Sequence, residues 1–435
     1  MQFTSPHPVL SLPPSSLTLP QFLLDVPDAN RAALPLFLPP AADSIFASTR
    51  PNLQPLSIDD TRARAIAVAQ GLLAGKLGGA PFKKGDVIAV ASANQHDYVA
   101  NVLGILLVGG VAALVNPAYK PREVVHALRV TGARAILASD APDVTKPLTD
   151  AEAQISPYQT AQEANQILRQ NGELDANLPI FLFEEGRSNS WSQIYEGQSA
   201  SEDELYSLNR ASGTDTAVCC FSSGTSGLPK AVALSHGNLI ANVIQSARSL
   251  ADRFNIPIKS GEEFGKNGAQ GWYDGTDVVR ARNLKSSNAD VPYISDEVHV
   301  DILPQFHCYG FMINLIAMHT VSLCHVLTPF CSLAYKEEFN QVTPRVVLPR
   351  FHLPTFLKTI QDARVTSSFV VPPVILALGK HPLIDQYDLS SLRVLGSGAD
   401  NLKNEIAKLV HDRLGVTTCD GYGMTGGQRR PRESC

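Results

Sequence analysis

Residues 216–234 read Thr-Ala-Val-Cys-Cys-Phe-Ser-Ser-Gly-Thr-Ser-Gly-Leu-Pro-Lys-Ala-Val-Ala-Leu, and this stretch is the most informative about the fold. Two apolar runs of strand length flank a segment of small and hydroxyl-bearing residues. Small residues let backbone N–H groups approach an anion closely, because no Cβ obstructs the way. Hydroxyl groups and a lysine add further donors, so the segment suits a polyphosphate. The residues of this expected phosphate loop are Ser222, Ser223, Gly224, Thr225, Ser226, Gly227 and Lys230.

Two other interpretations of the loop are weaker. The spacing of Gly224, Gly227 and Lys230 differs from the Walker pattern, and a strand rather than a helix is expected to follow. This spacing argues against a kinase-like or other nucleoside-triphosphate hydrolase. A flexible Gly/Ser hairpin is the second alternative, but such a hairpin would seldom combine four hydroxyls, two glycines and a Pro-Lys step.

Helical and strand-like apolar patterns alternate on both sides of the loop. Arg62–Lys76 has a helical stripe, and Asp86–Ser92 has the pattern of a buried strand. Tyr98–Val115 predicts a buried helix feeding a buried strand rather than a membrane span, because three glycines divide it. Such alternation predicts βαβ units and a parallel sheet covered on both faces. Further helices are expected at 121–130, 354–362 and 401–414, and further strands at 133–139, 216–221, 231–234, 299–303, 323–327 and 367–371.

The length of 435 residues suits two or three lobes rather than one core. Residues 1–55 are Pro-rich and are expected to form an irregular lead-in to a body at 56–425. Residues 140–214 and 252–295 interrupt the α/β rhythm as surface insertions, although Pro179–Phe183 has the pattern of one strand. A junction between two subdomains is expected near residue 215.

Composition excludes several classes of protein. Lys and Arg total 36 against 41 Asp and Glu, a net charge of -5, so no basic excess exists to bind nucleic acid. Seven cysteines without a paired spacing do not predict a disulfide framework. No G-x-S-x-G motif is present, which argues against a serine hydrolase of the α/β type. The spacing of His307, Cys308, Cys324, His325 and Cys331 does not match a zinc site.

The loop resembles the phosphate-binding signature of the adenylate-forming enzymes, which include acyl- and aryl-CoA synthetases and firefly luciferase. Other segments resemble further signatures of that family, in the family's order, and the 4-coumarate–CoA ligase-like branch is the most similar. These segments are the phosphate-loop extension Ser235–Asn242, the acyl-pocket motif Leu303–Gly310, the pocket-lining turn Val371–Val374, the glycine-rich strand end Gly396–Ala399 and the adenine-binding turn Gly421–Thr425.

The resemblance implies ATP-dependent conversion of an aryl or fatty acid to an acyl-AMP, followed by thioester formation with coenzyme A. It implies that Lys230, Thr425 and His307 serve catalysis, although a histidine among aromatic residues is more often part of a core. It implies that ATP and Mg²⁺ bind at the loop, with Thr225 near the metal. It implies an adenine site at Gly421, Tyr422, Gly423, Met424 and Thr425, and an acyl and adenine pocket at His307, Tyr309, Gly310, Val371, Gly396, Ser397, Gly398 and Ala399.

The sequence departs from the family after Thr425. Gly426 stands where the family has a glutamate associated with Mg²⁺, and residues 426–435 have no helical or strand pattern. The change at Gly426 is compatible with a frame change, an unspliced intron or an alternative transcript end. The small C-terminal lid domain with the adenylation lysine has no counterpart here. We therefore expect the N-terminal body of an acyl-CoA ligase, impaired in this form, with a non-catalytic binder of ATP or an acid as the alternative. A cytoplasmic location is expected, or a peroxisomal one for a longer form.

Overall fold

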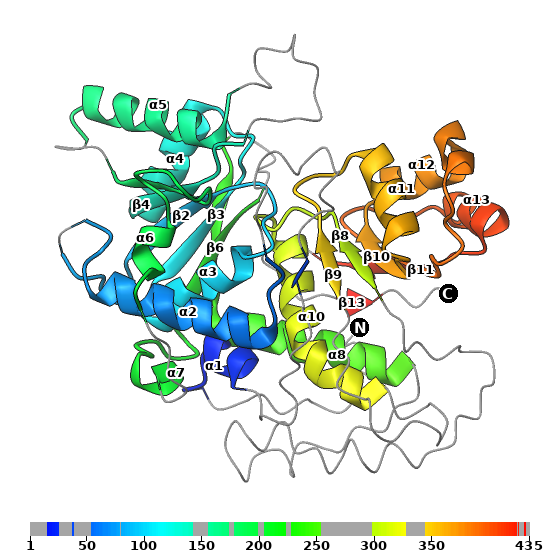
Figure 1. The fold of residues 1–435 in the computed structure, drawn as a ribbon, viewed down its shortest axis with the longest axis horizontal. Helices are drawn as coiled ribbons and strands as arrows, with labels where there is room; N and C mark the ends of the chain where they lie inside the picture. Colours follow the sequence, from blue (N-terminus) through cyan, green and yellow to red (C-terminus); the bar gives the residue numbers. More distant parts are fainter. Residues whose placement is uncertain are drawn as a thin grey trace, which may run out of the picture.

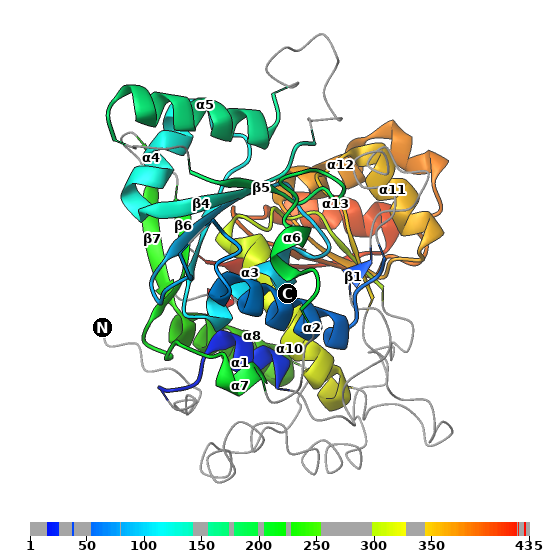
Figure 2. The same ribbon diagram turned by 60° about the vertical axis from the view of Figure 1, so that its left-hand side comes forward.

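Two β-sheets with packed helices organise the chain (Figures 1 and 2). The computed structural model describes residues 15–25, 37–38, 54–78, 80–141, 155–173, 178–198, 204–222, 228–253, 298–327, 344–423, 425 and 430–431. The expected α/β class is confirmed, since both sheets are mainly parallel and helices cover them.

The first sheet has six strands in the order β5-β4-β2-β3-β6-β7. All neighbouring strands are parallel except β7, which runs antiparallel to β6. Alternate residues of strand β2 face two different apolar cores, one on each face of the sheet, because side chains alternate across a strand. The strands are β2 (Val87–Ala91), β3 (Val111–Val115), β4 (Ala133–Ala138), β5 (Ile180–Leu182), β6 (Thr216–Ser222) and β7 (Lys230–Ser235).

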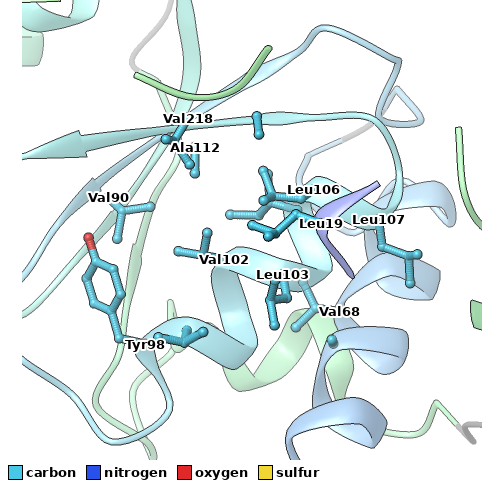
Figure 3. Packing of buried hydrophobic residues seen from close by; sticks show 14 of the residues in the cluster. Leu19, Val68, Val90, Tyr98, Val102, Leu103, Leu106, Leu107, Ala112 and Val218 are labelled. Atoms are coloured by element: carbon cyan, nitrogen blue, oxygen red, sulfur yellow. The ribbon is translucent and has the colours of Figure 1, made fainter. Parts of the chain in front are cut away.

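Helices cover the first sheet on both faces. Helices α2 (Ile58–Leu73) and α3 (Tyr98–Leu107) lie on one face, and α4 (Pro121–Thr131) and α5 (Pro157–Gln170) lie on the other. Every residue of α3 is buried, and its apolar side chains pack between α2 and the sheet (Figure 3). None of the helices in the described ranges combines the length and hydropathy needed to cross a membrane.

The second sheet has seven strands in the order β1-β9-β8-β10-β11-β12-β13, parallel except for β13. Helices α11 (Leu353–Asp362), α12 (Pro372–Lys380) and α13 (Asn404–Leu414) build a separate apolar core on one of its faces. The strands are β1 (Phe37–Leu38), β8 (His299–Asp301), β9 (Arg345–Val347), β10 (Ser367–Val370), β11 (Val394–Ser397), β12 (Thr417–Tyr422) and β13 (Arg430–Pro431).

Two long helices, α8 (His236–Arg253) and α10 (Cys308–Leu327), pack on each other and belong to the first core. The remaining short helices in the described ranges are α1 (Leu19–Leu24), α6 (Ser192–Tyr195), α7 (Glu204–Ser207) and the 3₁₀ helix η5 (Pro382–Gln386).

A loop of the first sheet is hydrogen-bonded to the second sheet through Asn94, three residues beyond the end of β2. The Asn94 amide nitrogen donates to the carbonyls of Leu303 (2.9 Å) and Leu348 (3.1 Å). Its Oδ1 accepts the backbone N–H of Gln305 at 2.7 Å, and its own N–H donates to the Pro349 carbonyl at 3.1 Å. Asn94 is only 2% exposed, so these bonds hold the two sheets together away from solvent.

Most of the expected strands and helices lie where the sequence predicts them, but one expected strand differs from the structure. Residues 323–327, expected as a strand, end helix α10, because a short apolar run does not distinguish a strand from a buried helix. The lead-in contains α1 and β1, and the tail contributes β13. Residues 140–214 supply α5 and the sheet strand β5, which lies where a strand was expected at 179–183. The junction between subdomains near residue 215 stays a prediction.

Helix α1 is attached to the body by a buried histidine. All six of its residues are buried, and the Leu19 N–H donates to Nδ1 of His236 at 3.1 Å. His236 is fully buried, and its Nε2 has no hydrogen-bond partner among the described residues. Burial lowers the pKa of His236 from its ordinary value of 6.5 to about 4, against a weaker raising effect of Asp215.

This burial predicts acid sensitivity at His236. Between pH 6.5 and pH 4 the unfolded chain binds more protons at this position than the folded chain, so stability falls as the pH falls. We expect His236 to contribute a loss of roughly 2–3 kcal/mol in the free energy of unfolding between pH 7 and pH 4.5. Urea unfolding at both pH values should show a smaller loss in His236→Asn, whose amide oxygen replaces the acceptor. An equal loss in both proteins would contradict this assignment.

A buried ion pair lies in the second sheet. Arg345 Nε donates to Asp301 Oδ2 at 2.7 Å and Arg345 Nη2 bonds the other carboxylate oxygen, with the two side chains 6% and 4% exposed. His299 lies beside this pair, with Nε2 at 3.5 Å from Asp301 Oδ1 and Nδ1 at 3.0 Å from the Ser367 hydroxyl. Burial, with help from Arg345, holds the pKa of His299 well below its usual range, so the ring is neutral.

Removing the arginine would leave a buried carboxylate unpaired. We expect Arg345→Met to lower the free energy of unfolding by about 3–5 kcal/mol in urea denaturation at pH 7. The matched control is Lys408→Met, which breaks an exposed ion pair with Asp412 and should cost no more than about 1 kcal/mol. Similar losses in the two variants would show that burial does not set the importance of the Arg345 pair.

Candidate functional site

The expected phosphate loop connects the two strands of an antiparallel hairpin. Ser222 at the end of β6 pairs with Lys230 at the start of β7. The two residues therefore lie opposite each other on either side of the loop. Lys230 is exposed and Ser222 is half-buried. The expectation that a strand rather than a helix follows the loop is confirmed. The expected loop residues Ser223, Gly224, Thr225, Ser226 and Gly227 lie outside the described residues.

Two residues that sequence reasoning missed contact the ends of this loop. His126 of α4 places Nε2 at 2.9 Å from the carbonyl oxygen of Pro229. The Tyr119 ring packs edge-on against Phe221, with 6.3 Å between the ring centroids. No motif distinguishes His126 or Tyr119, because they come from a distant part of the chain that the sheet brings close.

A second group of expected site residues gathers at the carboxyl edge of the second sheet. Strands β10 and β11 pair Val370 with Ser397, and β11 and β12 pair Ser397 with Asp420. The expected pocket and adenine segments therefore leave the sheet side by side at this edge, where open parallel sheets bind ligands. The residues concerned are Val371, Gly398, Ala399, Gly421, Tyr422 and Gly423.

The expected acyl-pocket motif reaches the same place from strand β8. The Cys308 Sγ lies 3.3 Å from the Thr425 hydroxyl, so the motif and the end of the adenine turn are in direct contact. Phe306, Cys308, Tyr309 and Phe369 also pack against the first core, and Val371 packs against both cores. The site residues thus lie where the two cores meet. Met424 and Gly426 lie outside the described residues, and the stacking role of Tyr422 stays a prediction.

Aromatic rings of the protein cover the two glycines of the strand end. A Cβ added at Gly396 would lie 2.4 Å from the Phe369 ring, and one at Gly398 would lie 2.7 Å from the Tyr309 ring. Ala399 follows with a φ of 72°, a left-handed conformation that a side chain seldom adopts. A side chain at either position would push the neighbouring ring aside, and the turn after Ser397 is strained at Ala399.

Three other expected pocket residues have clear structural positions. Val371 is the N-cap of α12, so the expected pocket-lining turn is the start of a helix. Gly310 lies in the first turn of α10, where a Cβ would be 2.2 Å from the Pro304 carbonyl oxygen. Ser397 is 3% exposed, and its hydroxyl has no partner among the described residues.

His307 is half-buried immediately before α10. Its Nδ1 accepts the backbone N–H of Tyr309 at 3.2 Å, so the neutral ring carries its proton on Nε2. The Cys308 Sγ lies 3.9 Å from the same Nδ1. The contact with Cys308 raises the pKa of His307 and outweighs the lowering effect of burial. With Nδ1 engaged by Tyr309, His307 can supply a hydrogen-bond donor through Nε2.

Cys308 is better placed to react than Cys219 or Cys220. Burial by itself raises the pKa of this thiol, but its contacts with His307 and Thr425 outweigh burial and hold the pKa below its ordinary value. The pKa values of Cys219 and Cys220 are raised by burial. Since the thiolate is the reactive form, the three cysteines should differ strongly in reactivity.

We expect iodoacetamide at pH 7 to label Cys308 at least about tenfold faster than Cys219 or Cys220. Peptide mapping by mass spectrometry after timed labelling measures the three rates, and Cys308→Ser controls for the assignment of the peptide. Faster labelling of Cys219 or Cys220 would contradict the lowered pKa of Cys308.

The described residues contain no group of three or more His, Cys, Asp or Glu side chains that could hold a metal ion. Thr225, the expected neighbour of Mg²⁺, lies outside these residues, so its role stays a prediction.

Comparisons with known proteins match this chain to a family and to curated relatives. Residues 44–427 match the family described as AMP-binding enzyme. The chain is 30% identical over 349 residues to a probable 4-coumarate–CoA ligase 2 of Dictyostelium discoideum, covering 79% of this chain and 51% of that protein. It is 27% identical over 361 residues to 4-coumarate–CoA ligase 3 of Arabidopsis thaliana, covering 82% and 49%.

Solved structures share the fold. A red-emitting luciferase from Phrixothrix hirtus superposes with a TM-score of 0.61 at 20% identity, covering 98% of this chain and 63% of that one. The N-terminal domain of FACL13 from Mycobacterium tuberculosis superposes with a TM-score of 0.58 at 14% identity, covering 94% and 76%.

The chain belongs to the AMP-binding enzyme family, because the family match extends over most of its length. The resemblance to adenylate-forming enzymes, and within them to 4-coumarate–CoA ligases, is thereby confirmed. The chain spans about half the length of the curated relatives it matches.

Proposed function

We propose that this chain is the nucleotide- and acid-binding body of an acid–thiol ligase, which activates an aryl or fatty acid with MgATP. The contact between Cys308 and Thr425 is the main support, because it joins the acyl-pocket motif to the adenine turn at one sheet edge. The curated relatives are 4-coumarate–CoA ligases, which favours an aryl acid as substrate.

The proposed reaction overcomes the low reactivity of a carboxylate. A carboxylate oxygen attacks the α-phosphorus of ATP, the bond to the β-phosphate oxygen breaks, and acyl-AMP and pyrophosphate form. A thiol, either coenzyme A or a carrier-protein thiol, then attacks the acyl carbon and releases AMP. The protein contributes mainly positioning and charge neutralisation.

Three residues have distinct proposed roles in this reaction. Lys230, which is exposed at the end of the loop between β6 and β7, holds the β- and γ-phosphates of ATP. Thr425 places its hydroxyl against the α-phosphate. His307 points its proton-bearing Nε2 at the substrate carboxylate, since Nδ1 is engaged by Tyr309. The carboxylate oxygen then attacks the α-phosphorus between Thr425 and His307.

A second candidate function is a binder of ATP and acid without turnover. The glycine at position 426, where the family has a glutamate associated with Mg²⁺, favours this candidate. Losing one preorganised charge stabiliser can reduce a rate by about 10²–10³. Both candidates predict binding of nucleotide, and they differ in pyrophosphate chemistry.

Isotope exchange between ATP and pyrophosphate separates the two candidates. With 4-coumarate or dodecanoate present, acid-dependent exchange would support the ligase, and binding of ATP without exchange would support the non-catalytic binder. Phosphate release that does not depend on acid would contradict both and favour a nucleoside-triphosphate hydrolase.

The proposed role of Lys230 predicts a difference between nucleotides. We expect Lys230→Ala to weaken ATP binding about tenfold in isothermal titration calorimetry, because one charge-assisted contact to the phosphates is lost. AMP binding should change by less than about twofold, since AMP lacks the β- and γ-phosphates. The exposed Lys408→Ala is the matched control and should change neither affinity. An equal loss of ATP and AMP affinity in Lys230→Ala would overturn the role.

A further inference from the structure

We propose that Asn94 is a positioning residue for the acid side of the site, acting through the segment that carries His307. This inference rests on the proposed function, in which His307 meets the substrate carboxylate. Asn94 belongs to none of the motifs that indicate the family. Its place in the fold assigns it the role.

The bonds of Asn94 all go to two short segments of the second sheet. Its side chain bonds Leu303 and Gln305, which come four and two residues before His307, and it also bonds Leu348. Its backbone N–H bonds Pro349. One buried amide thus ties the chain leaving β8 to the chain leaving β9, and ties both to the first sheet.

A second contact reinforces the attachment of the same segment. The Gln95 backbone N–H donates to Gln305 Oε1 at 2.8 Å, and Gln305 is fully buried. Gln305 is therefore bonded to neighbouring residues of the first sheet through both its backbone N–H and its side chain. Little freedom remains for Phe306, the one residue that separates this anchor from His307.

The segment is also continuous with helix α10. The His307 N–H donates to the Pro304 carbonyl at 3.1 Å, and the Phe311 N–H donates to the His307 carbonyl at 2.9 Å. His307 thus lies between a segment anchored by Asn94 and the first turn of a buried helix. The position of its ring depends on the anchor, because the helix alone leaves the preceding residues unattached.

Replacement of the amide should affect the two halves of the ligand differently. In Asn94→Asp the carboxylate still accepts from the Gln305 N–H, but it faces the carbonyls of Leu303 and Leu348 without a donor. The buried carboxylate repels the two carbonyl oxygens, so the segment from Leu303 to His307 shifts. Acid binding should weaken, whereas AMP binding at the adenine turn should change little.

The experiment compares two ligands on the full 435-residue chain. Isothermal titration calorimetry measures AMP and 5′-O-[N-(4-coumaroyl)sulfamoyl]adenosine, a stable analogue of an acyl-adenylate. The dissociation constant of AMP divided by that of the analogue reports how much the acid side contributes to binding. We expect Asn94→Asp to reduce this ratio by about tenfold. Asn94→Ser, which keeps one donor in a smaller side chain, should reduce it less and serves if the aspartate variant does not fold.

Asn101→Asp is the matched control. Asn101 is equally buried in α3, accepts the Trp191 indole N–H at 3.0 Å and donates to the Asp97 carbonyl at 2.9 Å. The substitution again keeps an acceptor and removes a donor, but within the first sheet's own layer. Its melting temperature should fall, while the ratio of dissociation constants stays as in the wild type.

The outcomes separate this inference from the proposed function. If the wild-type chain binds the analogue no more tightly than AMP, the acid site itself is absent and the proposed function fails. If the wild type prefers the analogue and both Asn94 variants keep that preference, the positioning role is wrong. A reduced ratio in Asn101→Asp as well would show a general effect of stability and would also overturn the role.

Discussion

The buried side-chain amide of Asn94 fixes the position of the two β-sheets relative to each other. Each sheet has an apolar core of its own, but a core is not directional and permits many relative orientations. The hydrogen bonds of Asn94 have fixed directions and no competing water, so they select one arrangement. The position of His307 at the meeting of the cores depends on that selection.

The site follows from the geometry of parallel sheets. Strands β8, β10, β11 and β12 run in the same direction, so their carboxyl ends lie along one edge. Segments separated by more than a hundred residues leave the sheet there, and the Cys308–Thr425 contact joins the first of them to the last. The β6–β7 hairpin belongs to the other sheet, so the proposed nucleotide site needs both halves of the molecule.

Polar groups buried for structure lie close to those proposed for chemistry. The Asp301–Arg345 pair and His299 lie in the neighbouring strands β8 and β9, and β8 leads into the segment that carries His307. His299 is held neutral, whereas His307 has its pKa raised by its cysteine neighbour. The pKa values of two histidines eight residues apart are thus shifted in opposite directions because their surroundings differ. The raised pKa of His307 agrees with the carboxylate partner that we propose for it.

The sequence by itself determined the family, the α/β class, the two strands that flank the expected phosphate loop and most of the central strands. Small residues, hydroxyls and alternating apolar runs are local signals that need no knowledge of distant neighbours. Periodicity could not identify residues 323–327 as helix, because a short apolar run fits both structures. Helix α1 was hidden because it is attached through His236, which lies far away in the chain. Strand β13 was hidden because its two residues, Arg430 and Pro431, are too few for a periodic pattern. Only the tertiary structure decided the contacts of Asn94 and His126, because each is hydrogen-bonded to residues that folding brings near.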